Sequence, residues 1–265
     1  MQNIVRIRKE HFEGLVDPEE ARDIFLGRQV IACWIKLGEI QAKEMPLLAP
    51  RVLAEHPDMF LTFARLGGSV DPRTDSIKRW VLKYGLPRRT VVRKGEYKDT
   101  HMLLEDFKEE ARDAHRLLKL YAEIRGQDIV AIKARAKNPQ TSLDEALGAT
   151  FNSTAYRALL SVGVYEKDDV SLFMSLRVLT EAVNEKLERL QPRLRALSAS
   201  TVVESWYCPD LLTAMYLQLY LLIANRRAMR YCDFCGAPFP YRGNKFYCND
   251  TCRSRARHQR NAEAN

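Results

Sequence analysis

Four cysteines near the C-terminal end constrain this chain more than any other feature. Cys232 and Cys235 are separated by two residues, twelve residues follow, and three residues separate Cys248 from Cys252. Zinc prefers four ligands in a tetrahedron, and thiolates suit this borderline-soft ion. The C-x2-C and C-x3-C pairs supply four thiolates within a short stretch, so they predict one structural zinc ion.

The first cysteine pair predicts a tight knuckle turn that aims both sulfurs at one point. Gly236 follows the second sulfur, where such a turn often needs a positive φ that glycine adopts without strain. Residues 241–245 then predict a further turn, with Gly243 and Asn244 at its tip.

The second cysteine pair favours a helix, because residues four apart lie on one helix face. Asn249 or Asp250 can cap this helix through a side-chain oxygen. The helix is predicted to continue to residue 260 and to carry a stripe of arginines. These are Arg253, Arg257 and Arg260, with Arg255 further round.

Two other roles for the cysteines fit the sequence less well than zinc. Disulfides need an oxidising compartment, and nothing in the sequence indicates export. A redox C-x-x-C normally accompanies a βαβ pattern, which this sequence lacks, and it would leave the second pair unexplained. Cys208 lies far from Cys232 along the chain, so we do not expect it to act as a fifth ligand.

The segments CDFCGAPF and KFYCNDTCR resemble the treble-clef zinc fingers that end many bacterial proteins. Among these are the CGNR-type (ABATE-like) fingers of presumed stress-response transcription regulators. The resemblance is specific over residues 231–260 and extends weakly to residues 208–219. The tetrad CGNR is absent, and Cys252-Arg253-Ser254-Arg255 stands in its place. The resemblance therefore implies a bacterial protein and a zinc fold, and leaves the target open.

Positive charge is concentrated beside the cysteines. The net charge is +8, of which residues 226–265 carry +6 through nine basic and three acidic residues. One zinc ion with four thiolates leaves this segment at about +4. A solvated basic tail is one interpretation, and an electrostatic surface for phosphates is the other. Arginines on a zinc-fixed helix favour the phosphate surface.

The composition of the whole chain is that of a soluble globular protein. The whole chain is 46% hydrophobic and 29% charged, and its first residues lack the apolar segment of a secretory signal. The most apolar run, residues 211–224, is shorter than the roughly 20 residues of a membrane span. We therefore expect a cytoplasmic protein with no membrane partner.

Residues 1–228 predict one mainly helical domain with two or three short strands, and residues 229–265 a small four-cysteine finger that depends on zinc. A capping box places Ser142 at the start of a short helix, with Glu145 three residues on. Residues 155–162 fit either a helix or a strand. Other helices are predicted over residues 17–25, 57–66, 71–85, 101–125, 129–136, 168–190 and 211–224, with strands over residues 4–8 and 201–207.

Motifs of common enzyme classes are missing from the sequence. It contains no HExxH, G-x-S-x-G, P-loop or G-x-G-x-x-G, and its five histidines are scattered. A zinc ion held by four thiolates has no open position for substrate or water. We therefore predict a protein that is not an enzyme; an enzyme housed in the helical domain is a weaker alternative.

The leading functional hypothesis is a bacterial transcription regulator that binds nucleic acid, DNA in preference to RNA. The predicted phosphate contacts are Arg242, Lys245, Arg253, Arg255, Arg257 and Arg260. The helical domain would dimerise, sense a signal or contact another protein. The alternative is an adaptor whose finger docks a protein, because fold alone does not decide between these targets. Three nearby aromatic residues are expected to pack inside the finger rather than stack on bases: Tyr241, Phe246 and Tyr247.

Overall fold

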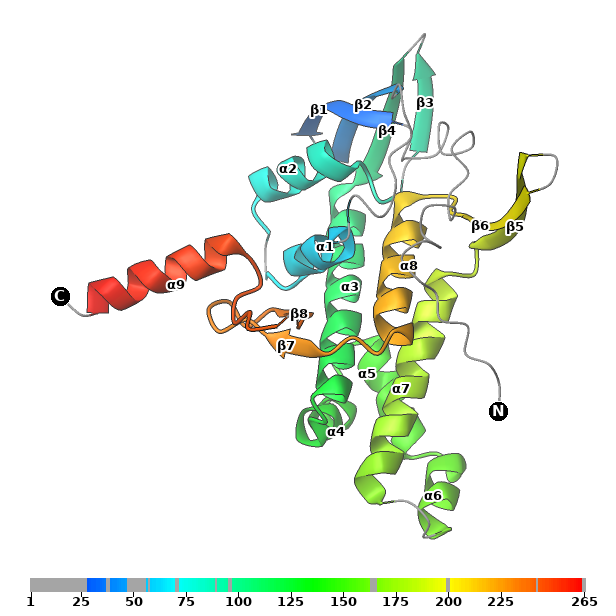
Figure 1. Cartoon of the computed structure of the whole chain (residues 1–265), viewed down its shortest axis with the longest axis vertical. Coiled ribbons are helices and arrows are strands. Elements are labelled where there is room, and N and C mark those ends of the chain that lie inside the picture. The colour runs from blue at the N-terminus through cyan, green and yellow to red at the C-terminus, as the bar shows by residue number, and fades with distance from the viewer. Residues whose placement is uncertain are drawn as a thin grey trace. The chain divides into compact units, whose positions relative to one another are not determined.

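The computed structural model describes residues 28–36, 39–46, 56, 58–69, 72–88, 90–94, 97–162, 166–198, 201–241 and 243–263. Within these ranges the chain is mainly helical, as the sequence predicts (Figure 1). It divides into two compact units, one made of residues up to Arg112 plus Lys186–Gln218, the other of Asp113–Glu185 plus Leu219 onward. The predicted strand over residues 4–8 and the predicted helix over residues 17–25 lie outside the described residues. The predicted domain boundary after residue 228 stays a prediction.

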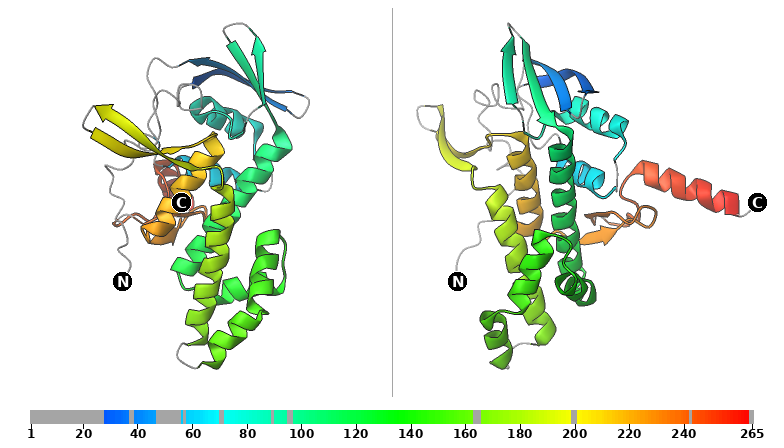
Figure 2. Two further views of the ribbon diagram at one scale, coloured as in Figure 1. Left: turned by 90° about the vertical axis from the view of Figure 1, so that its right-hand side faces the viewer. Right: turned by 180° about the vertical axis from the view of Figure 1, so that it is seen from behind.

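The first unit contains more strand than the sequence indicates. Four antiparallel strands form a sheet in the order β1-β2-β4-β3, and a separate hairpin pairs β5 with β6 (Figure 2). The strands are β1 (Arg28–Lys36), β2 (Glu39–Pro46), β3 (Thr90–Lys94), β4 (Tyr97–Leu103), β5 (Gln191–Ser198) and β6 (Thr201–Tyr207). Strand β6 confirms the prediction for residues 201–207. The expectation of two or three short strands was too low, because β1 to β4 pair across a long stretch of sequence.

The core of the first unit lies between α1 (Met59–Gly67), α2 (Thr74–Tyr84), the start of α3 (Leu104–Arg125) and the start of α8 (Leu211–Ala224). Aromatic rings dominate it: Phe63 contacts both Trp80 and Phe107 at centroid distances of 5.0 and 5.2 Å. Helix α3 begins three residues later than predicted because residues 101–103 complete β4.

A close backbone contact and a pair of buried hydrogen bonds fix α1 in this core. A Cβ added at Gly67 would lie 1.8 Å from the carbonyl oxygen of Ala111, so only glycine lets the two backbones meet. The buried amide of Gln218 accepts a hydrogen bond from the backbone N–H of Phe60 at 2.9 Å and donates one to the carbonyl of His56 at 2.7 Å. A polar side chain inside an apolar helix is thus satisfied by backbone groups.

The second unit contains the rest of α3 and α8 together with α4 (Ile129–Lys137), α5 (Ser142–Phe151), α6 (Thr154–Ser161) and α7 (Lys167–Lys186). Residues 155–162, which fitted either structure, form most of α6. Helix α7 ends four residues earlier than predicted, because Gln191 already pairs with Tyr207 in the β5–β6 hairpin.

The predicted cap of α5 was wrong by one residue. Thr141, not Ser142, has the extended backbone of an N-cap, and its hydroxyl accepts a hydrogen bond from the backbone N–H of Asp144 at 3.2 Å. Asp144 rather than Glu145 is therefore the third residue of the motif. The carboxylate of Asp144 also binds a side chain of a neighbouring helix, and this contact explains why the cap lies one residue earlier than predicted.

That side chain is Arg135, which joins three helices of the second unit through a buried ion-pair network. Its guanidinium donates to Asp144 at 2.8 Å and to Glu123 at 2.9 Å, and the Glu123 side chain is only 2% exposed. Burial alone would raise the pKa of Asp144, but the hydrogen bonds from Arg135 and Thr141 outweigh it and lower that pKa. The network fixes α4 and α5 to α3.

Tyr121 on α3 holds the segment that leads into the cysteine-rich region. Its hydroxyl lies 2.8 Å from the carbonyl oxygen of Leu222 and 2.9 Å from that of Arg227. The ring is 1% exposed, and burial raises the pKa of this tyrosine to about 12. One neutral hydroxyl thus anchors the end of α8 and the start of the following strand.

None of the helices in the described part of the chain combines the length and the apolar composition that a membrane crossing needs. This includes α8, which is apolar and has fourteen residues.

Candidate metal centre

The first pair of cysteines lies in a knuckle between two short strands. β7 (Met229–Tyr231) pairs with β8 (Pro238–Pro240), and Cys232 follows β7 directly. The carbonyl of Cys232 accepts a hydrogen bond from Gly236 at 2.8 Å, and Gly236 has a φ of 67°. The positive φ predicted for this glycine is confirmed, and it lets the chain reverse within four residues.

The second pair lies at the start of α9 (Asp250–Glu263). Cys248 precedes the helix, and Cys252 belongs to its first turn. Asn249 caps the helix, because its side-chain oxygen accepts a hydrogen bond from the backbone N–H of Cys252 at 2.8 Å. Of the two caps that the sequence allowed, the structure therefore uses Asn249 rather than Asp250.

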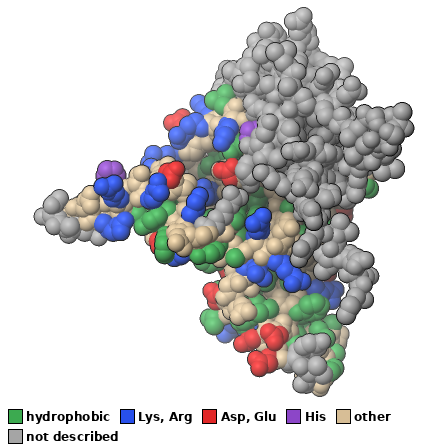
Figure 3. All heavy atoms as spheres, in the orientation of Figure 1, with side chains coloured by type: hydrophobic (Ala, Val, Ile, Leu, Met, Phe, Trp, Pro, Cys, Tyr) green, Lys and Arg blue, Asp and Glu red, His purple; other side chains and the backbone are tan. Residues whose placement is uncertain are grey.

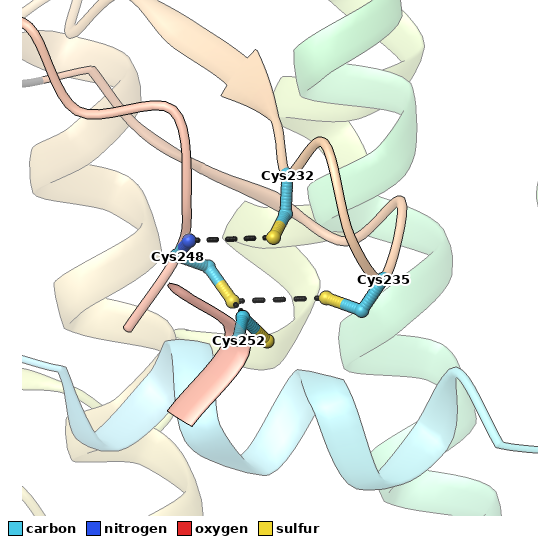
Figure 4. A group of neighbouring side chains, drawn as sticks. All are labelled: Cys232, Cys235, Cys248 and Cys252. Atoms are coloured by element: carbon cyan, nitrogen blue, oxygen red, sulfur yellow. Dashed lines mark hydrogen bonds between the residues drawn. The ribbon is translucent and has the colours of Figure 1, made fainter. Parts of the chain in front are cut away.

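The four sulfur atoms lie within 4.8 Å of one another and point toward a common centre (Figure 4). The Sγ of Cys248 is 3.7 Å from that of Cys235 and 3.5 Å from that of Cys252. In a regular tetrahedron with metal–sulfur bonds of about 2.3 Å, the sulfurs would be roughly 3.8 Å apart. The four cysteines predicted as ligands are therefore close enough to hold a metal ion.

Backbone hydrogen bonds favour the thiolate form of Cys232. Burial of this side chain works in the opposite direction, but N–H groups of Cys235, Cys248 and Phe234 outweigh it and lower the pKa of Cys232 to about 6. One of these donors is the backbone N–H of Cys248, 3.4 Å from the sulfur. Burial raises the pKa of Cys252 instead. Metal binding needs the deprotonated thiols, so the knuckle prepares one ligand in advance.

A small apolar core supports the cysteines. Phe239 is buried with Cys232 and Cys252, and Phe234 and Tyr247 pack against them. The prediction that Tyr247 packs inside this region is confirmed. It was wrong for Phe246 and Tyr241, which are 47% and 43% exposed. Two cysteines and Phe239 already fill the small interior, so the other two rings remain at the surface.

Sequence reasoning missed a contact of Phe246 with a basic side chain. The guanidinium of Arg230 lies over the Phe246 ring, 4.1 Å from its centroid. The two residues are sixteen apart, and only the pairing of β7 with β8 and the return of the chain to the knuckle bring them together. The adjacent Lys245 and Phe246 were the available signal, since exposed aromatics within a basic segment often serve binding.

The predicted basic residues of α9 are exposed. From Arg253 to Ala262, Ala256 alone is partly buried, and basic side chains, which are all arginines in this helix, stand out along it in Figure 3. Arg253 forms a surface ion pair with Asp250 at 3.1 Å, a contact of little energetic weight. Exposed basic residues at predicted positions are Lys245, Arg253, Arg255, Arg257 and Arg260; the predicted Arg242 lies outside the described residues.

Two other features resemble sites but lack the groups that a site needs. Cys208 is 1% exposed, and burial together with the nearby Asp210 raises the pKa of its thiol to about 12, so it behaves as a core residue. A hollow of about 230 Å³ lies between α7 and α8. Its lining is apolar and neutral: Thr180, Val183, Asn184, Tyr220, Ile223 and Ala224.

No family model, curated protein or solved structure matches this chain. The geometry of the cysteine cluster and the charge of α9 are therefore the observations on which a function can be built.

Proposed function

We propose that Cys232, Cys235, Cys248 and Cys252 bind one zinc ion and that residues 229–263 form a treble-clef finger. A hairpin with a knuckle supplies two sulfurs, and the start of a helix supplies the other two, which is the arrangement expected of such a finger. Four thiolates in a tetrahedron select zinc among the common divalent ions. The ion is structural, because all four positions around it are taken by protein.

The finger binds nucleic acid through the exposed arginines of α9. Helix α9 packs through Cys252 and the partly buried Ala256 near its start, and its other side chains from Arg253 to Ala262 are exposed and available to a partner. Arg253 and Arg257 lie on one face a turn apart, and a planar guanidinium meets phosphate oxygens with two parallel hydrogen bonds. The single observation that carries this proposal is the exposure of four arginines on a helix whose first turn contains a metal ligand.

The most direct partner is DNA, and the cellular role is transcription regulation in a bacterium. The resemblance of residues 231–260 to CGNR-type fingers supports this role, and the net positive charge of the C-terminal segment supports a phosphate-bearing target. The helical units would then dimerise or respond to a signal, leaving contact with DNA to the finger.

The test measures affinity of the zinc-loaded full chain for a labelled duplex of about 20 base pairs by fluorescence anisotropy between about 50 and 200 mM salt. Binding should weaken steeply with salt. The double substitution Arg253→Ala, Arg257→Ala should weaken it roughly tenfold per arginine and reduce the salt slope by about 2. The matched control is Arg157→Ala, Arg177→Ala, which removes the same charge from exposed positions on α6 and α7.

An affinity that changes neither with salt concentration nor with substitution of the α9 arginines would contradict the proposal. Equal losses of affinity in the two double variants would also contradict it, because the effect would then come from the net charge of the protein and not from the arginines of α9. If zinc-loaded protein binds no nucleic acid at all, the finger is instead a docking module for a protein.

A further inference from the structure

Phe246 and Tyr241 are exposed rings of the finger, and Arg230 contacts Phe246; these three residues are here called the aromatic patch. Both rings are close to half exposed. The described residues of this finger include a third exposed ring, Tyr231, and so many large rings at the surface beside so small an apolar core call for an explanation. Neither Phe246 nor Tyr241 is among the aromatic side chains that pack on the cysteines.

The pairing of β7 with β8 relates two members of the patch, Arg230 and Tyr241. Arg230 is opposite Phe239 in the register, and the backbone N–H of Tyr241 donates to the carbonyl of Ala228 at 2.7 Å, which extends the pairing by one step. Side chains alternate between the two faces of a strand, and directly paired residues share a face. Tyr241 therefore lies on the same face as Arg230, diagonally across the hairpin, with the buried Phe239 between them on that face.

The contact between Arg230 and Phe246 orients the ring. The guanidinium covers one face of the ring at 4.1 Å from its centroid, and a weaker ion pair with Asp233 at 3.7 Å holds the arginine in place. Phe246 is 47% exposed and the Arg230 side chain 33% exposed, so part of the ring and part of the guanidinium are accessible to a planar ligand. Nucleic-acid bases stack on aromatic rings and on arginine planes alike.

Charge around the patch is suited to a phosphate backbone. Lys245 precedes Phe246 in the chain and is exposed, and Arg226 and Arg227 are exposed just before β7. Asp233, an acidic side chain beside the patch, is paired with Arg230 at 3.7 Å. Aromatic rings beside basic side chains suit a single-stranded nucleic acid, because its bases can stack on the rings and its phosphates can pair with the cations.

We infer that the aromatic patch stacks unpaired bases, so that the finger prefers single-stranded nucleic acid, or a duplex with an unpaired end, to a blunt duplex. This rests on the proposed function, since the α9 arginines supply the phosphate contacts and the patch adds the base contacts. In a duplex the base faces are already stacked on one another, so Phe246 and Tyr241 gain a partner only where bases are unpaired.

The experiment compares four probes of about 12 nucleotides on the zinc-loaded full chain: a single-stranded oligo-dT, the matching oligo-U RNA, an abasic strand with the same phosphates, and a blunt duplex. The abasic strand keeps the charge and removes the rings. Oligo-dT should bind at least about tenfold more tightly than the abasic strand. The ratio of oligo-U to oligo-dT affinity distinguishes RNA from DNA as the source of the bases.

The decisive variant is Phe246→Leu, Tyr241→Leu, which keeps apolar side chains and removes the aromatic faces. It should bind oligo-dT about tenfold or more weakly and leave affinity for the abasic strand within about twofold. The matched control is Phe173→Leu, Tyr220→Leu, which changes exposed rings on α7 and α8. Zinc content of each variant shows that the finger is folded.

Equal binding of oligo-dT and the abasic strand, or tighter binding of the blunt duplex, would overturn the inference while leaving arginine-dependent phosphate binding intact. Parallel losses on oligo-dT and abasic strands in the leucine variant would also overturn it, since the rings would then be structural. A protein that binds none of the four probes refutes both the inference and the proposed function.

Discussion

The side-chain oxygen of Asn249 accepts a hydrogen bond from the backbone N–H of Cys252 at 2.8 Å. One residue thereby caps α9 and positions one of the four clustered cysteines in its first turn. The backbone carbonyl of Asn249 also accepts the N–H of Arg253 at 3.2 Å, the first hydrogen bond of the helix. Cap, ligand and the first arginine of α9 are thus coupled within five residues.

Replacing Asn249 by alanine should therefore weaken both the helix and the metal site. Loss of an N-cap side chain costs about 1 kcal/mol, which corresponds to a roughly fivefold lower zinc affinity if helix formation accompanies metal binding. Competition with a chromophoric chelator measures this. Asn249→Ser keeps a capping oxygen and should stay close to the wild-type affinity; equal losses in both variants would argue against the cap.

Purified protein should contain one zinc ion per chain, and Cys248→Ser should remove most of it. Cys248 lies 3.7 Å and 3.5 Å from two other sulfurs, so its loss opens the site on the side where the knuckle meets the helix. Elemental analysis gives the stoichiometry. Cys208→Ala is the matched control and should keep its zinc, because that thiol is a buried core residue.

Substitution of Arg135 should destabilise the second unit strongly. Arg135→Ala leaves Glu123 and Asp144 as buried carboxylates without their partner, at a cost of about 3–5 kcal/mol in the free energy of unfolding. Urea unfolding measures the loss, with the exposed Arg177→Ala as control. The same ion pair predicts a dependence on pH, because the folded-state pKa of Asp144 lies below its ordinary value. The contribution of Asp144 to the free energy of unfolding is therefore present near neutral pH and is lost as the pH falls through that lowered pKa. Wild type and Arg135→Ala should converge in acid.

Tyr121 should make stability fall at alkaline pH. Its pKa is about 12 in the folded protein and 10.0 as the ordinary value. Because the folded pKa is raised, its stabilising effect is complete below about pH 10 and is lost as the pH rises toward about 12. The loss should reach roughly 3 kcal/mol. Tyr121→Phe should be less stable near neutral pH by about 1–3 kcal/mol, since the two carbonyls lose the one hydroxyl hydrogen that they share. A pH-dependent difference of the opposite sign between the two proteins would refute this role.

Local sequence signals located most helices and the metal centre. The helix over residues 211–224 was predicted at the bounds that the structure shows, because apolar residues run between Pro209 and a charged segment. The four cysteines were found by spacing alone, since metal geometry leaves few ways to arrange two such pairs. Gly236 and the cap on α9 followed from the same local rules.

Long-range pairing could not be found in this way. Strand β2 pairs with β4 through partners such as Ile40 and Met102, and no local pattern tells one segment which distant segment it will meet. The same limit applies to Phe246, whose surroundings depend on Arg230 in another strand. The cap of α5 was misplaced because Asp144 is held by Arg135 from a neighbouring helix, a contact that the sequence does not show.

The most direct test of the account compares duplex binding by one sample of full-length protein before chelation, after zinc is removed, and after zinc is returned. If a metal ion fixes α9 on the knuckle, affinity should fall at least about tenfold on chelation and recover when one equivalent of zinc is added. The salt slope should fall and recover with it. Affinity and salt slope that stay unchanged through the cycle would contradict the claim that a metal-held helix binds nucleic acid.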